Sequence, residues 1–390
     1  MNRANAARPR CSGVVSGDSP LSTLQQRLLY MERFPERRFV NIVENVPQWP
    51  SVEGAPDSAW RYVHNYAPSR GQRDLLERIA ARESRRREND VTLEQILVTN
   101  GALHALAMIF RQHQQPGAVA LCQAPVLGAV PEMLRSYGYR PVFFKSLDGR
   151  VDIAALRRLH SSDVRMIYLN TPLNPSGDIL APDTLEQLCA LAHELGAILV
   201  ADMVYDSYAF DHARVTSPQD LGVSWKNVYV VNSMSKNFGS PGLRVGWLVS
   251  TPENVHALLR VLELENISVC GLSQAIASDL LDRGNAVLVE AVRAGRQMLS
   301  ERLPQIAGIR FDVPAGGTQI FAELPVTDVE EFCDFALAEL GLCLVSASNY
   351  EGVQGAFVRL PMGAPPGTLE NALALLGAGL DAYRERTPLP

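Results

Sequence analysis

The sequence predicts an α/β fold: a large domain with a mostly parallel seven-stranded sheet between helices, followed by a smaller α+β C-terminal domain. From about residue 72, short apolar segments alternate with amphipathic segments of helical spacing. The apolar segments, such as ILVT at 96–99, are nearly continuous, which is typical of parallel strands buried on both faces. After about residue 252 this alternation gives way to long helical segments, which indicates a second lobe.

Apolar stretches predict the strands, and helical spacing of apolar residues predicts the helices. Strands are expected in seven apolar stretches: 96–99, 118–122, 140–144, 164–169, 197–201, 227–232 and 244–249. A helix is expected at 21–34 near the N-terminus, and helices of the first lobe at 72–87, 101–113, 129–137, 152–160 and 182–195. The second lobe is expected to contain helices at 253–265, 272–303, 328–340 and 368–384 and a strand at 355–360. Gly316 and Gly317 are consistent with a simple hairpin turn.

These elements divide the chain into parts. Residues 1–18 are expected to be disordered, and residues 19–58 to form an N-terminal arm and part of the small domain. Residues 59–265 are expected to form the large domain that binds the ligand. Residues 266–390 are expected to form a long linking helix and the C-terminal small domain.

The bulk properties argue against several classes of protein. The formal net charge of -6 argues against nucleic acid or an anionic membrane as the main partner. The six cysteines have no CxxC spacing and no nearby histidine cluster, so neither a disulfide framework nor a metal site is expected. No apolar run of about 18 residues and no secretory signal is recognisable, so we expect a cytoplasmic protein.

Polar residues follow several predicted strands. Lys236 ends the segment SMSK at 233–236, and Asp202 ends AILVAD. Asn174 lies in the loop after the expected strand 164–169, and Arg244 begins the expected strand 244–249. Ligands of parallel α/β sheets bind outside the carboxyl ends of the strands, so these side chains are expected to share one site. Taken singly, each has a structural explanation as a turn former, a cap or a surface cation. Their joint order and spacing indicates a site.

With these motifs the chain resembles the aspartate aminotransferase family, the fold-type I enzymes of aminotransferase class I/II that depend on pyridoxal 5′-phosphate (PLP). The resemblance runs from about Tyr66 to Arg359. NPSG at 174–177 is similar to the family's N-P-[ST]-G, DMVY at 202–205 to D-x-x-Y, and SMSK to S-x-S-K followed by an arginine. The remaining matching segments are YAPSRG at 66–71, TNGAL at 99–103 and PAGG at 314–317.

The resemblance implies a role for each matching residue. Lys236 would hold the cofactor as a Schiff base and act as a base near Cα, and Asp202 would pair with the pyridine nitrogen. Tyr205 and Asn174 would hydrogen-bond the pyridine O3′, and Arg359, with Asn174 nearby, would bind the substrate α-carboxylate. The other implied cofactor-binding residues are Gly101, Ala102, Leu103, Leu127, Ser233, Ser235, Arg244 and, across a dimer interface, Tyr66.

These residue types suit the chemistry. PLP acts as an electron sink, which works best with a protonated ring nitrogen, and Asp202 supplies the counter-charge. A desolvated Lys236 near Arg244 should have a lowered pKa, which helps it both as a nucleophile and as a base. The guanidinium of Arg359 can bind a carboxylate through two parallel hydrogen bonds.

The sequence departs from the family pattern in three places. Leu127 takes the position of the aromatic residue that commonly stacks on the cofactor ring; it could pack there, or the site could have diverged toward another reaction. Val46 precedes Pro47 where many relatives have glycine, and Trp49 could line the pocket or pack the arm. Glu263 and Glu265 could receive a basic substrate side chain or could lie on a solvated helix face.

The leading functional interpretation is transamination of an L-amino acid with a 2-oxo acid, by a homodimer with shared active sites. The alternative is elimination, replacement or cyclisation of a modified, possibly hydroxylated arginine-like amino acid, as in enzymes similar to capreomycidine synthase. A regulatory protein without catalysis is a third possibility, but the sequence has no helix-turn-helix extension and no basic face. The expected partner is a small-molecule amino acid, with no nucleic acid and no membrane.

Overall fold

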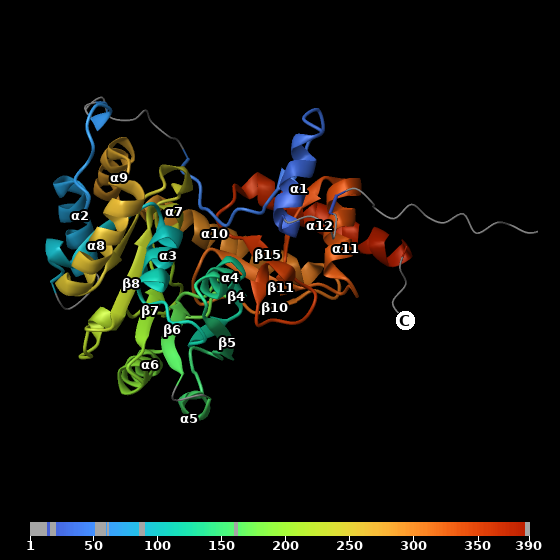
Figure 1. The fold of residues 1–390 in the computed structure, drawn as a ribbon. Coiled ribbons are helices and arrows are strands. Elements are labelled where there is room, and N and C mark those ends of the chain that lie inside the picture. The colour runs from blue at the N-terminus through green and yellow to red at the C-terminus, as the bar shows by residue number, and fades with distance from the viewer. Residues whose placement is uncertain are drawn as a thin grey trace, which may run out of the picture.

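The computed structural model describes residues 14–15, 21–50, 60, 62–85, 90–159 and 163–386. The predicted disorder over 1–18 therefore lies almost wholly outside the described residues. Figure 1 shows two lobes: a larger one that contains the long sheet, and a smaller one formed by the C-terminal elements together with the N-terminal helix.

The larger lobe is built on a seven-stranded sheet in the order β2-β9-β8-β7-β6-β3-β5. Only β9 runs antiparallel to its neighbours, and the other pairs are parallel. This confirms the predicted fold class. The strands are β2 (Ile96–Thr99), β3 (Val119–Ala124), β5 (Arg140–Lys145), β6 (Val164–Asn170), β7 (Ile198–Asp202), β8 (Val228–Ser233) and β9 (Gly246–Val249).

Helices cover both faces of this sheet. Successive side chains of a strand point to opposite faces, so Leu121 packs into one core and its neighbour Cys122 into the other. The first face is covered by α2 (Arg73–Arg85), α5 (Ile153–Arg158), α6 (Pro182–Glu194) and α9 (Gly271–Arg283). The second is covered by α3 (Ala102–Gln112), α4 (Ala129–Ser136) and α8 (Pro252–Asn266). Burial on both faces explains the continuous apolar strands.

The smaller lobe has a four-stranded antiparallel sheet in the order β10-β11-β15-β13. Its strands are β10 (Arg310–Phe311), β11 (Gln319–Glu323), β13 (Val345–Ser346) and β15 (Phe357–Pro361). The helices packed on it are α10 (Ala286–Arg302), α11 (Val329–Phe335), which continues as a π-helical turn to Leu340, and α12 (Pro366–Arg386).

The N-terminal segment joins the smaller lobe and then leads toward the larger one. In α1 (Thr23–Glu32) the buried Arg27 forms ion pairs with Glu330 and Asp334. Next, β1 (Val40–Asn41) pairs in parallel with β12 (Leu342–Cys343). The following residues, 42–50, which we call the arm, run in blue between the lobes in Figure 1. The arm therefore contacts both lobes.

Two sequence expectations are corrected. The prediction of one continuous helix over 272–303 is wrong: α9 ends at Arg283, directly before Gly284 with its φ of 73°, and α10 begins after Asn285. The Asn285 amide donates to the Asn237 carbonyl at 2.7 Å, which anchors this break. The two glycines at 316–317 are more than a hairpin turn, because their N–H groups donate to the carbonyls of Gly177 and Tyr208 in the larger lobe.

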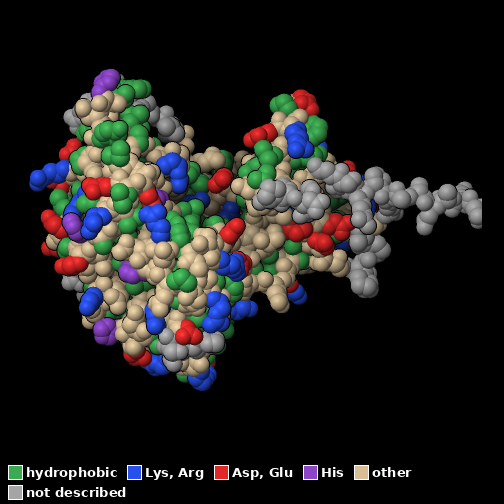
Figure 2. All heavy atoms as spheres, viewed as in Figure 1, with side chains coloured by type: hydrophobic (Ala, Val, Ile, Leu, Met, Phe, Trp, Pro, Cys, Tyr) green, Lys and Arg blue, Asp and Glu red, His purple; other side chains and the backbone are tan. Residues whose placement is uncertain are grey.

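Three further observations concern the helices, the surface charge and the possible metal ligands. No helix among the described residues is long and apolar enough to cross a membrane. On the face shown in Figure 2, basic and acidic side chains are interspersed rather than gathered into one patch, and the surface is hollowed between the lobes. Within the described ranges, no group of three or more His, Cys, Asp or Glu side chains is placed to hold a metal ion.

Candidate functional site

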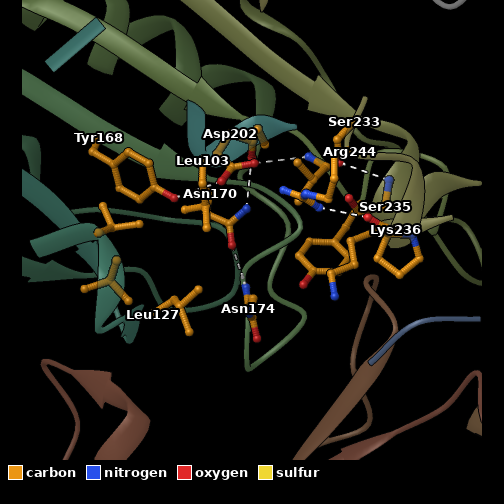
Figure 3. A pocket seen from close by; sticks show the side chains of 16 residues that line it. Leu103, Leu127, Tyr168, Asn170, Asn174, Asp202, Ser233, Ser235, Lys236 and Arg244 are labelled. Atoms are coloured by element: carbon orange, nitrogen blue, oxygen red, sulfur yellow. Dashed lines mark hydrogen bonds between the residues drawn. The ribbon is translucent and has the colours of Figure 1, made fainter. Parts of the chain in front are cut away.

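A cavity of about 250 Å³ lies where β6, β7 and β8 end, at the carboxyl edge of the large sheet. Figure 3 shows Tyr168 on one side of it and Ser233, Ser235, Lys236 and Arg244 on the other. The cavity thus gathers side chains from segments far apart in the chain. The predicted site residues that line it are Ala102, Leu103, Leu127, Asn174, Asp202, Tyr205, Ser233, Ser235, Lys236 and Arg244.

Asp202 supplies a buried carboxylate at the end of β7. Its Oδ2 accepts a hydrogen bond from the Tyr168 hydroxyl at 3.0 Å, and its Oδ1 accepts one from the Val204 N–H at 3.3 Å. Burial raises the pKa of Asp202 to about 6. It forms no ion pair with a Lys or Arg of the described chain, so a cation in the cavity would stabilise its ionised form.

Two asparagines hold the loop after β6. Asn170 lies opposite Asp202 in the parallel ladder, and its amide donates to the Asp202 carbonyl at 2.9 Å. The Oδ1 of Asn170 accepts from the Asn174 N–H at 2.8 Å. The loop closes at Gly177, whose φ is 76° and where an added Cβ would lie 2.4 Å from the Gly316 carbonyl oxygen. This geometry keeps Asn174 facing the cavity.

Lys236 lies in the single-turn helix α7 (Met234–Asn237), directly after β8. The Ser233 hydroxyl caps that turn by accepting from the Ser235 N–H at 3.3 Å. Burial lowers the pKa of Lys236 to about 8; the positive charges of Arg359 and Arg244 act in the same direction, and Glu44 opposes them. The lysine is therefore closer to neutral at physiological pH than a surface lysine is.

One end of the cavity is suited to an anion. Helix α3 begins there after Gly101, which has a φ of 78°. The guanidinium of Arg244 lies so close to Gly101 that a Cβ added there would be 2.6 Å from Nη2. Backbone N–H groups at the start of α3, the Arg244 guanidinium and the hydroxyls of Ser233 and Ser235 are donors of the kinds that bind phosphate groups in proteins.

An apolar wall formed by Val126, Leu127 and Val130 bounds the cavity. Leu127 belongs to β4 (Val126–Leu127), which pairs with β14 (Tyr350–Glu351) of the smaller lobe. Among the residues that line the cavity, only Tyr168 and Tyr205 are aromatic. Both have hydrogen-bond partners on other residues. Leu127 lines the cavity, and its packing on the cofactor ring stays a prediction.

Arg359 comes from β15 of the smaller lobe and does not line the cavity itself. Its Nη1 donates to the Tyr350 hydroxyl at 2.9 Å, and its Nη2 donates to the Val43 carbonyl of the arm. The Tyr350 hydroxyl in turn donates to Asn174 Oδ1 at 3.1 Å. Within the described chain, the buried Nε–H of Arg359 has no acceptor. A carboxylate placed beside it would provide one.

Other predicted residues lie outside the cavity. Tyr66 is 80% exposed in the single chain. Glu263 and Glu265 are exposed on α8, and the Glu265 carboxylate is bonded to Arg111 and to His104 of α3. Trp49 donates from its ring nitrogen to the Phe238 carbonyl at 2.9 Å, which fits the packing role.

Sequence reasoning missed four residues: Tyr168, Asn170, Tyr350 and Asn45. The alternation in β6 was a usable signal, because Tyr168 and Asn170 are two residues apart and point to the same face of the sheet as Asp202, which lies opposite Asn170. Tyr350 and Asn45 come from short irregular segments. Asn45 donates to the Tyr205 hydroxyl at 2.8 Å, and it accepts from Lys236 Nζ at 2.8 Å.

The donor set fits PLP. A phosphate-binding end, a buried amine of lowered pKa and a buried carboxylate without a cation match the phosphate, the aldehyde and the ring nitrogen of that molecule. Lys236, Asp202 and Arg244 would be the principal groups that hold it. The residues present are thus chemically sufficient for the cofactor that the sequence motifs imply.

Comparisons with known proteins agree with this chemistry. The family aminotransferase class I and II matches residues 42–376. The chain is 40% identical to an L-aspartate:5-guanidino-3-methyl-2-oxopentanoate transaminase of Pseudomonas syringae pv. syringae, over 95% of this chain and 97% of that protein. It is 36% identical to the 3-methylarginine biosynthesis aminotransferase ArgM of Streptomyces arginensis, over 93% and 98% respectively.

The fold is also shared with solved structures. The aspartate aminotransferase of Thermotoga maritima superposes with a TM-score of 0.84, covering 96% of this chain and 100% of that one at 24% identity. By sequence, the chain is also 28% identical to a capreomycidine synthase of Streptomyces vinaceus, over 74% of this chain and 75% of that protein. The protein is an enzyme that moves an amino group between an amino acid and a 2-oxo acid. The chain belongs to the aminotransferase class I and II family of PLP-dependent enzymes.

Proposed function

We propose that this enzyme transfers the amino group of L-aspartate to a 2-oxo acid with a guanidino side chain, and so forms a 3-methylarginine-type amino acid and oxaloacetate. The observation that carries the proposal is the near full-length similarity to a relative whose name states these two substrates and to a second that is named for 3-methylarginine biosynthesis. The transfer is balanced, because the amino group lost by one acid is gained by the other.

We assign the site residues as follows. Lys236 forms the covalent bond to the cofactor and, once released, moves a proton at Cα; Asp202 pairs with the ring nitrogen, and Tyr205 and Asn174 bind O3′. Arg359 binds the α-carboxylate. The cofactor supplies an electron sink for the bond broken at Cα. The phosphate is bound by Gly101, Ala102, Leu103, Ser233, Ser235 and Arg244, and Leu127 packs on the ring.

We assign recognition of the guanidinium group to Glu44 of the arm. The residue before it, Val43, binds Arg359 through its carbonyl, and the residue after it, Asn45, binds Lys236. Glu44 is exposed, and it forms no hydrogen bond or ion pair with another described residue. Its charge nevertheless acts on Lys236, where it opposes the lowering of the pKa. Glu265, in contrast, is engaged by Arg111 and His104.

We propose a cytoplasmic homodimer with shared active sites, in which Tyr66 reaches the partner's cofactor phosphate. Exposed apolar side chains on the larger lobe support a second subunit: Tyr66 is 80% exposed and Leu264 is 89% exposed. Buried, unpaired Cys122 and Cys333 are consistent with a reducing compartment. We also propose that the arm with its small-domain part (19–58), the large domain (59–265) and the C-terminal unit (266–390) are the functional domains.

A second function, cyclisation or elimination on a modified arginine, is favoured by the similarity to capreomycidine synthase and by the aliphatic Leu127. One experiment separates the two. The purified, PLP-loaded protein is incubated with L-aspartate and 5-guanidino-3-methyl-2-oxopentanoate, and the products are identified by mass spectrometry. The proposal requires oxaloacetate and 3-methylarginine in equal amounts, with none from Lys236→Ala. Ammonia or a cyclised product from a hydroxylated arginine, without transfer from aspartate, would overturn it.

A further inference from the structure

We propose that Asn45 is a positioning residue that holds the Lys236 amine through a hydrogen-bond acceptor and directs the Tyr205 hydroxyl proton into the cavity. This inference rests on the roles assigned above to Lys236 and Tyr205. It goes beyond them because Asn45 lies in the arm, outside the strand-end motifs.

The contacts of Asn45 join three parts of the molecule. Its side chain is buried, with only 2% of the residue exposed. The amide nitrogen Nδ2 donates to Tyr205 Oη at 2.8 Å and to Gln319 Oε1 of β11 at 2.7 Å. The amide oxygen Oδ1 accepts from Lys236 Nζ at 2.8 Å. A single side chain of the arm therefore bridges the lysine, the tyrosine and the smaller lobe.

The orientation of the Asn45 amide is fixed by its neighbours. Gln319 Nε2 donates to the Leu173 carbonyl at 3.4 Å, so Gln319 Oε1 is the atom that faces Asn45. That oxygen also accepts from the Thr318 hydroxyl at 3.0 Å. Because an acceptor needs a donor opposite it, Asn45 must turn Nδ2 toward Gln319. Its Oδ1 is then left to face Lys236, which can only donate.

This orientation has a consequence for Tyr205. A phenolic oxygen can accept hydrogen bonds and can donate one. Since Tyr205 Oη accepts from Asn45, its own proton is directed elsewhere, and no acceptor for it exists among the described residues. Tyr205 lines the cavity. Its hydroxyl is therefore set to donate to an oxygen bound there.

The consequence for Lys236 concerns its charge. An amide oxygen interacts more strongly with an ammonium group than with a neutral amine, so Asn45 favours the protonated form. The charged and titratable groups around the amine are Arg359 of β15, Arg244, Glu44 of the arm, and Tyr205 and Asp202, which line the same cavity. Burial and the two arginines disfavour the protonated form, and Asn45 and Glu44 counteract them.

The test measures the pKa of the Lys236 amine in the cofactor-free protein. Competitive acylation at a series of pH values, followed by mass spectrometry of the peptide that contains Lys236, gives this pKa without any need for activity. Asn45→Leu removes the acceptor, and we expect the pKa to fall by about one unit. Asn45→Asp has the same shape but carries a negative charge, and we expect the pKa to rise by about one unit or more.

The matched control is Asn41→Ala. Asn41 is the last residue of β1, directly before the arm, and its Oδ1 accepts from the Val43 N–H at 3.1 Å, but it does not contact Lys236. It should leave the Lys236 pKa unchanged. If both Asn45 variants keep the wild-type pKa, the proposal is overturned; because Asn45→Asp is isosteric, it remains informative even if Asn45→Leu fails to fold. Borohydride reduction of the PLP-loaded wild-type protein tests separately whether Lys236 binds the cofactor.

Discussion

Two buried aspartates, four residues apart, are treated differently by this fold. Asp206 pairs with the buried Arg82 at 2.6 Å and accepts from the amides of Asn237 at 2.6 Å and Asn232 at 3.1 Å. Asp202 accepts one side-chain hydrogen bond, from Tyr168, and one from a backbone N–H, and it has no cation among the described residues. Asp202 lines the cavity, whereas Asp206 does not.

The difference indicates a structural role for Asp206 and a ligand-binding role for Asp202. A buried charge that is paired and hydrogen-bonded holds elements together, and here Asp206 ties α2 to β8 and α7. A buried carboxylate without its counter-charge destabilises the empty fold and is retained where a ligand supplies the missing cation. The raised pKa of Asp202 is the signature of that second situation. Four predictions test the comparison.

The largest effect is expected for Asp206→Asn. This change breaks the pair with Asp206 and leaves the buried Arg82 guanidinium with Glu83, 2.6 Å away, as its carboxylate partner; breaking a buried pair costs about 3–5 kcal/mol. The free energy of unfolding of the cofactor-free protein, measured by urea denaturation, should fall by that amount. A loss of under about 1 kcal/mol would show that the ion pair between Asp206 and Arg82 contributes little to stability.

Asp202→Asn should instead raise the free energy of unfolding of the cofactor-free protein. The folded-state pKa of about 6 is above the ordinary 3.8, so the carboxyl is ionised at pH 7 only at a cost in stability. The stability of the wild-type protein relative to the variant should therefore decrease as the pH rises from about 4 to above 6. At pH 7 the cofactor-free variant should be more stable by up to roughly 3 kcal/mol. Urea denaturation at each pH measures this, and equal pH profiles for both proteins would contradict it.

A smaller effect is expected for Tyr168→Phe. The Tyr168 hydroxyl donates to the ionised carboxylate, so its removal should raise the pKa of Asp202 further, by about one unit. Carbon-13 NMR titration of the aspartate carboxyl groups in the cofactor-free protein measures the change. Tyr229→Phe is the control, because Tyr229 is equally buried but bonds His113 instead. The same shift in both variants would indicate a general effect on the fold.

The smallest effect extends the comparison to two glutamates at the surface. Glu44 has no partner among the described residues, whereas Glu265 is paired with Arg111. Glu44→Gln should lower kcat/KM for the guanidino substrate by about two- to fivefold, the range of an exposed ion pair, and lower it less for aspartate. Glu265→Gln should change neither. Steady-state kinetics with each substrate decides, and equal losses for both substrates would remove Glu44 from recognition of the guanidinium.

The candidate site was predictable from sequence where its residues follow strands. Asp202, Asn174 and Lys236 each come after an apolar stretch, and parallel strands bring such ends together whatever the rest of the chain does. The break between α9 and α10 was not predictable from periodicity, since both helices keep helical spacing on either side of Gly284. The anchor at that break, Asn285 to Asn237, is a long-range contact.

The sequence by itself determined the order of strands and helices along the chain, the two-lobed fold class and the residues at the strand ends. These depend on local periodicity and on the direction of parallel strands. The tertiary structure alone decided that Asn45 meets Lys236 across 191 positions, that Arg359 is held by Tyr350 and Val43, and that Asp202 lacks the cation Asp206 has. Such contacts join irregular segments whose positions are set by the packing of both lobes, and no local pattern encodes them.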